Sequence, residues 1–214
     1  GLLPGVCFVA GFGPCLPPVQ ARVAVAGPAI ADTLFGDANP GGKLPVTFPR
    51  SVGQIPLYYN HRRTGRPVKE SEKYTSKYLD VPNTPLYPFG HGMTYGRIEY
   101  GPLSLSSPKL ASNGEITVST RVTNRGRRAA EEVVQLYVHD RSASVTRPIR
   151  ELKAFRKVRL APGQSETVSF RIRRSDLLFI GQQNRPTVEP GMFNVWIAPS
   201  AEAEGANGSF ELLA

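Results

Sequence analysis

Residues 116–126 read ITVSTRVTNRG, and this stretch decides the fold class of the chain. Apolar side chains at Ile116, Val118 and Val122 alternate with polar ones, which is the period of two typical of a strand with one buried face. The tripeptide 124–126 then supplies a turn. The stretch therefore predicts a half-buried β-strand that ends in a tight turn.

The same kind of pattern continues through the rest of residues 98–214. Further strands are expected at residues 134–138, 152–160, 167–172, 193–197 and 210–213. Turn sequences Ala-Pro-Gly at 161–163 and Glu-Pro-Gly at 189–191 separate some of them. Six or seven short strands divided by turns predict an antiparallel β-sandwich over residues 98–214.

The composition agrees with a mainly β protein. Gly and Pro account for 21 and 20 of the 214 residues, whereas average usage would give about 26 for the pair. A chain that is 40% hydrophobic and 20% charged can form a core, which excludes wholesale disorder. No stretch of about 18 uninterrupted apolar residues is present, so no membrane partner is expected. Two cysteines are too few for a structural zinc site, and we expect no metal or cofactor.

Residues 1–26 are an atypical Pro/Gly-rich segment. No charged side chain occurs before Arg22, and no basic region precedes the apolar residues, so we do not expect this segment to be a signal peptide. Four prolines are expected to interrupt any helix here: Pro4, Pro14, Pro17 and Pro18. We expect the segment to be disordered, or to come from a frameshifted reading frame. Because the chain begins with Gly, it is also expected to be part of a longer protein.

Residues 27–97 contain few regular elements. A short helix is predicted over 27–35, with Gly36 as its stop, and a short strand over 43–48. Residues 50–97 have no long periodic pattern, which predicts a long irregular connection that wraps a neighbouring surface. Its aromatic residues are expected to be buried there: Tyr58, Tyr59, Tyr74, Tyr78, Tyr87 and Phe89.

The net charge of +9 is concentrated in one region. Residues 121–185 hold 15 Lys and Arg against 6 Asp and Glu, and the remainder of the chain is balanced. The basic residues fall on outward strand positions and turns: Arg121, Arg171 and Arg173, and Arg125, Arg127 and Arg128. Such charges are typical of solvated faces and protected sheet edges. Because no DNA- or RNA-reading motif accompanies them, no nucleic-acid partner is expected, and nucleic-acid binding is the weakest of three hypotheses.

Candidate catalytic residues are scarce. His61 lies beside two arginines, His139 is expected at the surface, and His91 is expected to pack or to donate a hydrogen bond in a tight passage. Glu131 and Glu132 are neighbours on a strand, so they point to opposite faces and cannot act as a pair. No nucleophile elbow, Walker loop or His-Glu-x-x-His motif occurs. We therefore assign no catalytic, substrate-binding or metal residue.

Several collinear motifs resemble glycoside hydrolase family 3 β-glucosidases of the bacterial periplasmic type. They are the stretches 30–50 (IADTLFGDANPGGKLPVTFPR), 51–59 (SVGQIPLYY), 60–67 (NHRRTGRP), 74–80 (YTSKYLD) and 85–95 (PLYPFGHGMTY). The later stretches 122–126, 147–148, 151–158 (ELKAFRKV) and 160–163 (LAPG) resemble the C-terminal fibronectin type III-like domain of this family. The likeness runs over residues 27–214.

The resemblance implies a division of the chain into a remnant of an α/β-sandwich domain with its connecting segment (27–97) and a fibronectin type III-like, immunoglobulin-like β-sandwich (98–214). Members of the family hydrolyse terminal β-D-glucosyl residues with retention, and their two catalytic carboxylates lie in a barrel and an α/β-sandwich. No Asp or Glu here matches either motif, so the resemblance implies an enzyme fragment that is inactive alone. It also implies a periplasmic or secreted location.

Two other hypotheses stay open: the nucleic-acid binding considered above and a non-catalytic accessory role. A non-catalytic accessory module would stabilise a neighbouring domain or bind carbohydrate, and exposed aromatic platforms would favour the latter. Trp196 is expected to face outward, where a packing or interdomain role is preferred over a sugar platform. If family membership holds, the partners are a β-glucoside or oligosaccharide substrate together with an N-terminal barrel and α/β-sandwich domain.

Overall fold

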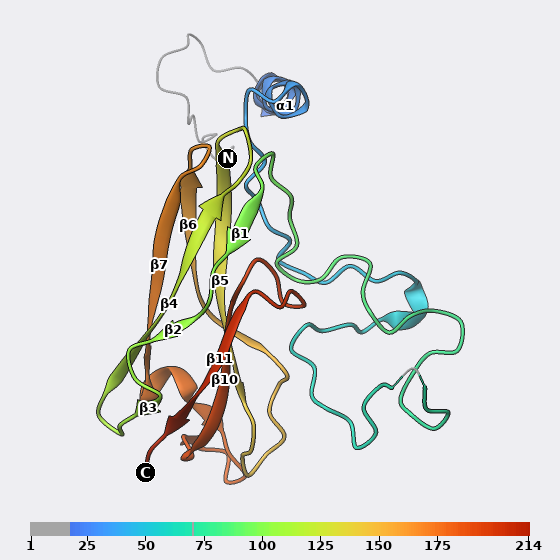
Figure 1. Ribbon diagram of the computed structural model, residues 1–214. Coiled ribbons are helices and arrows are strands. Elements are labelled where there is room, and N and C mark those ends of the chain that lie inside the picture. The colour runs from blue at the N-terminus through green and yellow to red at the C-terminus, as the bar shows by residue number, and fades with distance from the viewer. Residues whose placement is uncertain (1–17, 70) are drawn as a thin grey trace, which may run out of the picture. The chain divides into compact units, whose positions relative to one another are not determined.

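The structure is a computed structural model that describes residues 18–69 and 71–214. Predictions that concern residues 1–17, including those on Cys7 and Cys15, lie outside the described residues. The chain divides into two compact units, Gly1–Pro40 and Gly41–Ala214, and each is described by itself (Figure 1).

The described part of the first unit is dominated by helix α1 (Pro18–Phe35), which begins nine residues before the predicted start at residue 27. Pro18 is the first helical residue, where the missing N–H of proline leaves no intrahelical bond unmade. The prediction that Pro18 interrupts a helix is therefore wrong. Alanine is frequent through the helix and favours it, so that even the internal Pro28 is accommodated. Gly36, at φ 87°, follows the last turn, as the sequence predicted.

Residues 41–97 form an irregular segment, which we call the connecting segment. It contains one short 3₁₀ helix, η1 (Val52–Gln54), and the strand predicted over 43–48 is reduced to a single bridge between Phe48 and Tyr87. Its two ends run alongside each other: the Leu44 N–H donates to the His91 carbonyl, and the Gly90 N–H donates to the Leu44 carbonyl, both at 2.8 Å. Pro45 and Pro49 lack the N–H groups that would extend this pairing into a sheet.

Residues 98–214 form two facing sheets, and this mainly β architecture confirms the predicted fold class. The four-stranded sheet contains β1 (Ile98–Tyr100), β2 (Ser104–Leu105), β4 (Glu115–Asn124) and β7 (Ser165–Arg173). The five-stranded sheet has the order β3 (Lys109–Leu110), β11 (Ala206–Leu212), β10 (Gly191–Ala198), β5 (Ala130–Asp140) and β6 (Glu151–Leu160). A 3₁₀ turn η2 (Arg174–Leu177) and a small ribbon of β8 (Phe179–Ile180) and β9 (Pro186–Thr187) complete the described elements. All pairs are antiparallel except β11 with β3.

The core lies between the two sheets and follows the predicted alternation. On β4, Ile116, Val118 and Val122 are at most 1% exposed. Phe193 and Phe210 stack across β10 and β11, with ring centroids 5.4 Å apart. The six strands predicted from periodicity are all present, because alternate side chains contribute to this shared apolar interior; on β6 the buried ones are Val158 and Leu160.

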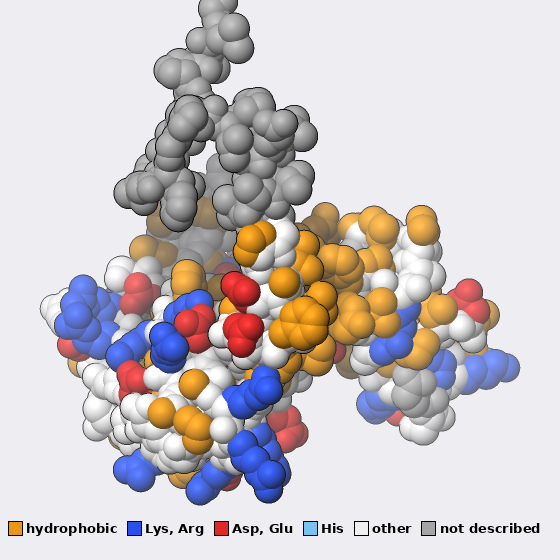
Figure 2. All heavy atoms as spheres, turned by 90° about the horizontal axis from the view of Figure 1, so that it is seen from above, with side chains coloured by type: hydrophobic (Ala, Val, Ile, Leu, Met, Phe, Trp, Pro, Cys, Tyr) orange, Lys and Arg blue, Asp and Glu red, His pale blue; other side chains and the backbone are white. Residues whose placement is uncertain are grey.

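The connecting segment covers part of the outer face of the five-stranded sheet. Tyr59 stacks on Phe89 with centroids 4.2 Å apart and meets Tyr137 of β5 edge-on at 6.2 Å. The predicted burial of the segment's aromatics is only partly right, since four of them remain exposed: Tyr58, Tyr74, Tyr78 and Tyr87. Figure 2 shows hydrophobic side chains spread over the lobe that the connecting segment forms, with Lys and Arg at the edge of this lobe and around the sandwich. No helix in the described residues is long and apolar enough to cross a membrane.

Candidate functional site

A groove of about 420 Å³ opens where the two ends of the connecting segment meet. Its lining comprises Gly42, Lys43, Leu44, Phe48, Tyr87, His91, Gly92 and Met93. The Tyr87 and His91 rings stack at 4.9 Å, and Met93 is 77% exposed. The groove is thus an open, largely apolar hollow with one lysine, and no Asp or Glu is among its lining residues.

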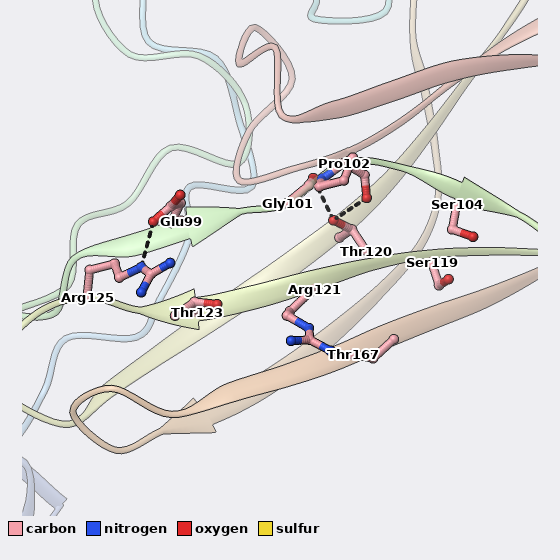
Figure 3. Close-up of a pocket in the computed structure, with 10 residues that line it drawn as sticks. All are labelled: Glu99, Gly101, Pro102, Ser104, Ser119, Thr120, Arg121, Thr123, Arg125 and Thr167. Carbon is pink, nitrogen blue, oxygen red and sulfur yellow. Dashed lines mark hydrogen bonds and ion pairs between the residues drawn. The ribbon is translucent and has the colours of Figure 1, made fainter.

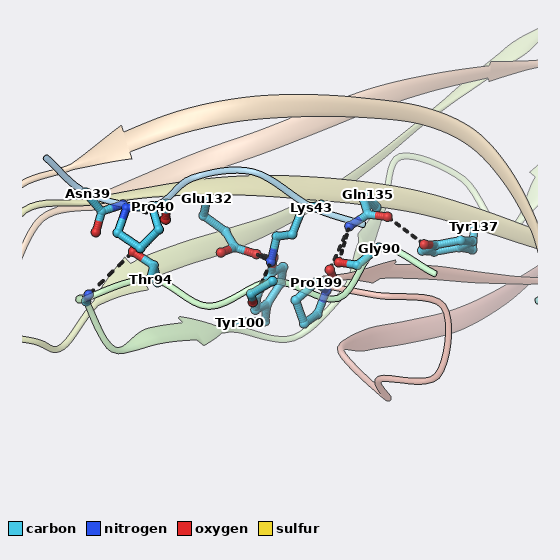
Figure 4. A network of polar contacts seen from close by, with 12 residues as sticks. Asn39, Pro40, Lys43, Gly90, Thr94, Tyr100, Glu132, Gln135, Tyr137 and Pro199 are labelled. Carbon is cyan, nitrogen blue, oxygen red and sulfur yellow. Dashed lines mark hydrogen bonds and ion pairs between the residues drawn. The ribbon is translucent and has the colours of Figure 1, made fainter. Parts of the chain in front are cut away.

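A buried ion pair lies beneath this groove (Figure 4). Lys43 Nζ is 3.0 Å from Glu132 Oε1 of β5, and the two side chains are 12% and 5% exposed. The Tyr100 hydroxyl donates to the same oxygen at 3.0 Å. Burial and the adjacent carboxylate raise the pKa of Tyr100, so it remains a neutral donor. Glu132 is therefore fully engaged in holding the connecting segment to the sandwich.

A second polar network lies beside it on the outer face of β5. The buried Gln135 amide donates to the Gly90 carbonyl at 3.3 Å and to the Pro199 carbonyl at 2.6 Å. Its oxygen accepts a hydrogen bond from the Tyr137 hydroxyl at 2.6 Å (Figure 4). Burial raises the pKa of Tyr137. These contacts satisfy every polar atom of the network, which is the pattern of a structural rather than a reactive group.

Trp196 lies on the outer face of β10, as predicted from its alternation with the core residues. The Arg150 guanidinium stands 4.4 Å from the centre of its ring and donates to the carbonyls of Ala201 and Ala203 at 2.5 and 2.7 Å. The ring is partly buried and belongs to the same small cluster as Tyr59 and Tyr137. Trp196 therefore packs between strand, loop and connecting segment, and it is no open platform for a sugar.

Asp140 at the end of β5 and Glu189, which lies between β9 and β10, have pKa values displaced in opposite directions. Burial raises the pKa of Asp140, and hydrogen bonds from Ser144 hold the pKa of Glu189 below its usual range. Such a divergence is one signature of an acid–base pair. Here, however, the Asp140 carboxylate accepts the Ser142 N–H, and Glu189 accepts both the N–H and the hydroxyl of Ser144. Both groups anchor the loop that follows β5.

The structure places the three histidines and the neighbouring pair Glu131 and Glu132 in different environments. His61 is exposed, and His91 packs on Tyr87 as expected. The prediction of a surface position for His139 is wrong: it is 6% exposed, and its Nδ1 lies 2.7 Å from the Pro148 carbonyl oxygen, because the loop after β5 folds back over the strand. Glu131 pairs with Lys157, on the face opposite to Glu132, as predicted. No cluster of three or more potential metal ligands occurs among the described residues.

Some of the basic residues on outward strand positions and turns form ion pairs with neighbouring acids. Arg125 pairs with Glu99, and Arg171 and Arg173 both reach Glu115.

Sequence reasoning missed the buried Lys43–Glu132 pair. A signal was available, because Glu132 shares the strand parity of the core residues and therefore had to face inward. Its cationic partner, 89 residues earlier in the chain, could not be inferred from any local pattern.

Comparison with known families matches two regions of the chain. Residues 22–95 match the glycosyl hydrolase family 3 C-terminal domain, and residues 132–201 match a fibronectin type III-like domain. The first match begins at residue 22, so at least residues 22–26 of the segment predicted to be atypical belong to the family pattern.

Individual relatives and solved structures agree with these matches. The chain is 51% identical over 189 residues to a periplasmic β-glucosidase of Salmonella typhimurium, covering 87% of this chain and 25% of the relative. It is 42% identical to a β-xylosidase of Formosa agariphila, covering 84% and 24%. A crystal structure of a β-glucosidase from Listeria innocua in complex with glucose aligns with a TM-score of 0.82 at 41% identity, covering 88% and 26%. The chain thus spans about a quarter of the length of these proteins.

Proposed function

Because this chain belongs to glycosyl hydrolase family 3 through its C-terminal domain and fibronectin type III-like domain, we propose that it forms the C-terminal quarter of a β-glucosidase. The single observation that carries this proposal is the 51% identity to a periplasmic β-glucosidase over 189 residues. The proposed reaction is the hydrolysis of terminal β-D-glucosyl residues. The proposed location is the periplasm or the cell exterior.

We propose that the catalytic carboxylates are supplied by the other three quarters of such an enzyme. Retaining hydrolysis needs two carboxyl groups about 5–5.5 Å apart. The buried acids in the described residues are engaged elsewhere: Glu132 by Lys43 and Tyr100, and Asp140 by Ser142. Neither acid is among the residues that line the groove described above. The proposed role of this chain is structural support of a catalytic region, and the chain alone is expected to be inactive.

Exposed apolar side chains support a partner for the connecting segment. Leu79 is 98% exposed, Val52 85% and Met93 77%. Hydrophobic side chains gathered on one lobe in this way are typical of a surface that another domain covers. We propose that the barrel and α/β-sandwich domain of the intact enzyme cover it.

A chimeric enzyme tests this proposal directly. Residues 22–214 would replace the matching quarter of the S. typhimurium β-glucosidase, and hydrolysis of an aryl β-glucoside would be measured for the chimera and for this chain alone. We expect turnover by the chimera and none above background by the chain. A folded chimera without activity would contradict the proposal, as would activity of the chain that a single carboxylate substitution abolishes.

The same chimeric enzyme tests whether this chain influences which sugar is hydrolysed. The relatives include both a β-glucosidase and a β-xylosidase. Aryl β-glucoside and aryl β-xyloside would therefore be compared in the chimera and in its unaltered parent. An unchanged preference would place substrate choice outside this chain, and a shifted preference would place part of it here.

A further inference from the structure

A second hollow lies on the outer face of the four-stranded sheet, and the proposed hydrolase role does not use it. Strands β1 and β2 both pair with the same edge of β4, but over residues 122–124 and 118–119. A gap is left between them, and residues 101–103 cross it (Figure 3). The resulting pocket has a volume of about 460 Å³, within the range of about 300–1,000 Å³ that is usual for small-molecule sites.

Backbone contacts fix the shape of this pocket. The Gly101 N–H donates to the Arg121 carbonyl at 2.8 Å. The buried Thr120 hydroxyl lies 2.8 Å from the Gly101 carbonyl oxygen and 3.2 Å from that of Pro102. A Cβ atom at position 101 would lie only 3.2 Å from the Arg121 carbonyl oxygen, so glycine permits this close crossing. The pocket is thus formed before any ligand arrives.

The lining is rich in hydroxyl groups, and its charged members are Arg121 and the Arg125–Glu99 ion pair. Outward positions of neighbouring strands supply Ser104, Ser119 and Thr167, and also Thr123, whose hydroxyl is hydrogen-bonded to that of Ser165 at 2.8 Å. Arg121 stands among them, opposite Thr167 in the strand register, and Figure 3 shows its side chain directed from β4 towards β7. Hydroxyls both donate and accept hydrogen bonds, so this lining suits a polyhydroxylated molecule.

Ion pairing distinguishes Arg121 from the other arginines discussed on this sheet face. The neighbouring Arg125 pairs with Glu99 at 2.8 Å, and the arginines at the far end of β7 pair with Glu115. Within the described part of the chain, the Arg121 side chain has no acidic or hydrogen-bonding partner. A guanidinium group binds a carboxylate through two parallel hydrogen bonds, which no neutral ligand can match.

We propose that this pocket binds a saccharide that carries a carboxylate, such as a uronic acid residue, with the carboxylate on Arg121 and the sugar hydroxyls on the surrounding serines and threonines. The pocket lies wholly on the β-sandwich and does not depend on the hydrolase proposal. A test by binding alone therefore succeeds or fails separately from any test of hydrolysis.

Titration of the ¹⁵N-labelled full chain with trigalacturonate, with a glucuronate-containing disaccharide and with neutral cellotriose tests the proposal. We expect saturable amide shifts in residues 99–104 and 119–125 with at least one acidic probe, and much weaker binding of cellotriose. The two acidic probes distinguish which uronic acid is the ligand. No saturable shifts with either acidic probe, or cellotriose binding as tightly, would overturn the proposal.

Two matched variants localise the binding. Arg121→Gln should weaken the acidic probe by about tenfold or more, because a charge-assisted pair is lost. Arg159→Gln removes the same charge from an exposed position on β6 and should leave affinity within about twofold. Equal weakening by both variants would reduce the effect to general charge attraction and overturn the site. Both positions are exposed, and unchanged unfolding midpoints would confirm that each variant is folded.

Discussion

Lys43 Nζ lies 3.0 Å from Glu132 Oε1, and this buried contact joins the start of the connecting segment to strand β5 of the sandwich. The region matched to the family 3 C-terminal domain and the region matched to the fibronectin type III-like domain each contribute one partner. The pair therefore makes the two regions depend on each other, since neither charge can stay buried without the other.

Removing one member of this pair should be strongly destabilising. Lys43→Met or Glu132→Gln is expected to lower the free energy of unfolding by about 3–5 kcal/mol, because one buried charge or polar group loses its partner. The double variant Lys43→Met/Glu132→Gln should lose less than the sum of the two single variants. Urea unfolding of the four proteins measures the coupling. Lys69→Met, which breaks an exposed pair with Glu72, is the control and should cost less than about 1 kcal/mol. Additive losses would show that the pair is not coupled.

Gly90 should tolerate no side chain. Its φ of 79° lies in the left-handed region, and an added Cβ would overlap the buried Gln135 amide. We expect Gly90→Ala to cost about 3 kcal/mol from strain and displacement together. Gly163→Ala is the matched control, since its φ is 75° and nothing lies within 4 Å of the added atom, so only the strain of about 1 kcal/mol applies. Equal unfolding midpoints for the two variants would contradict the proposed packing.

Asp140 should make stability depend on pH in a defined direction. Burial raises its pKa in the folded state above the ordinary 3.8, so the folded protein binds a proton more readily than the unfolded chain. The contribution of the Asp140 carboxyl to the free energy of unfolding therefore rises as pH falls through its folded pKa, and it is lost as pH rises. Asp140→Asn, which keeps the acceptor for the Ser142 N–H, should be more stable than the parent at neutral pH. The difference should vanish below pH 3.8. A constant difference from pH 3 to pH 7 would contradict this assignment.

The exposed apolar residues of the connecting segment should contribute to packing against the neighbouring domain of the intact enzyme and not to the stability of this chain. The double variant Val52→Glu/Leu79→Glu should change the unfolding free energy of this chain by less than about 0.5 kcal/mol, because both side chains are exposed. In the chimeric β-glucosidase the same change should cost at least half of the activity, since charges would be buried against the neighbouring domain. Ile180→Glu, at an exposed apolar position of the sandwich, is the control. Full activity of the double variant would exclude this surface as the covered one.

Much of the sandwich could be predicted because its strands have a local signal. The alternation at Ile116, Val118 and Val122 required only one buried face, and the structure provides it. The start of helix α1 was missed because proline was treated as a break, although at Pro18 it occupies the first helical position. His139 was misplaced because the loop that buries it folds back from residue 148, which no strand pattern predicts.

The sequence by itself determined the alternating strands, the turns between them and the family likeness, because each of these depends on residue type and spacing along a few neighbouring positions. The tertiary structure alone decided which residues meet across long separations. It brought Lys43 to Glu132 and Tyr59 to Tyr137, and among the described residues it left Arg121 without an ion-pair partner in a pocket between β1 and β2. Such pairings follow from how chain segments pack on a sheet face, and burial rather than local spacing fixes their energetic weight.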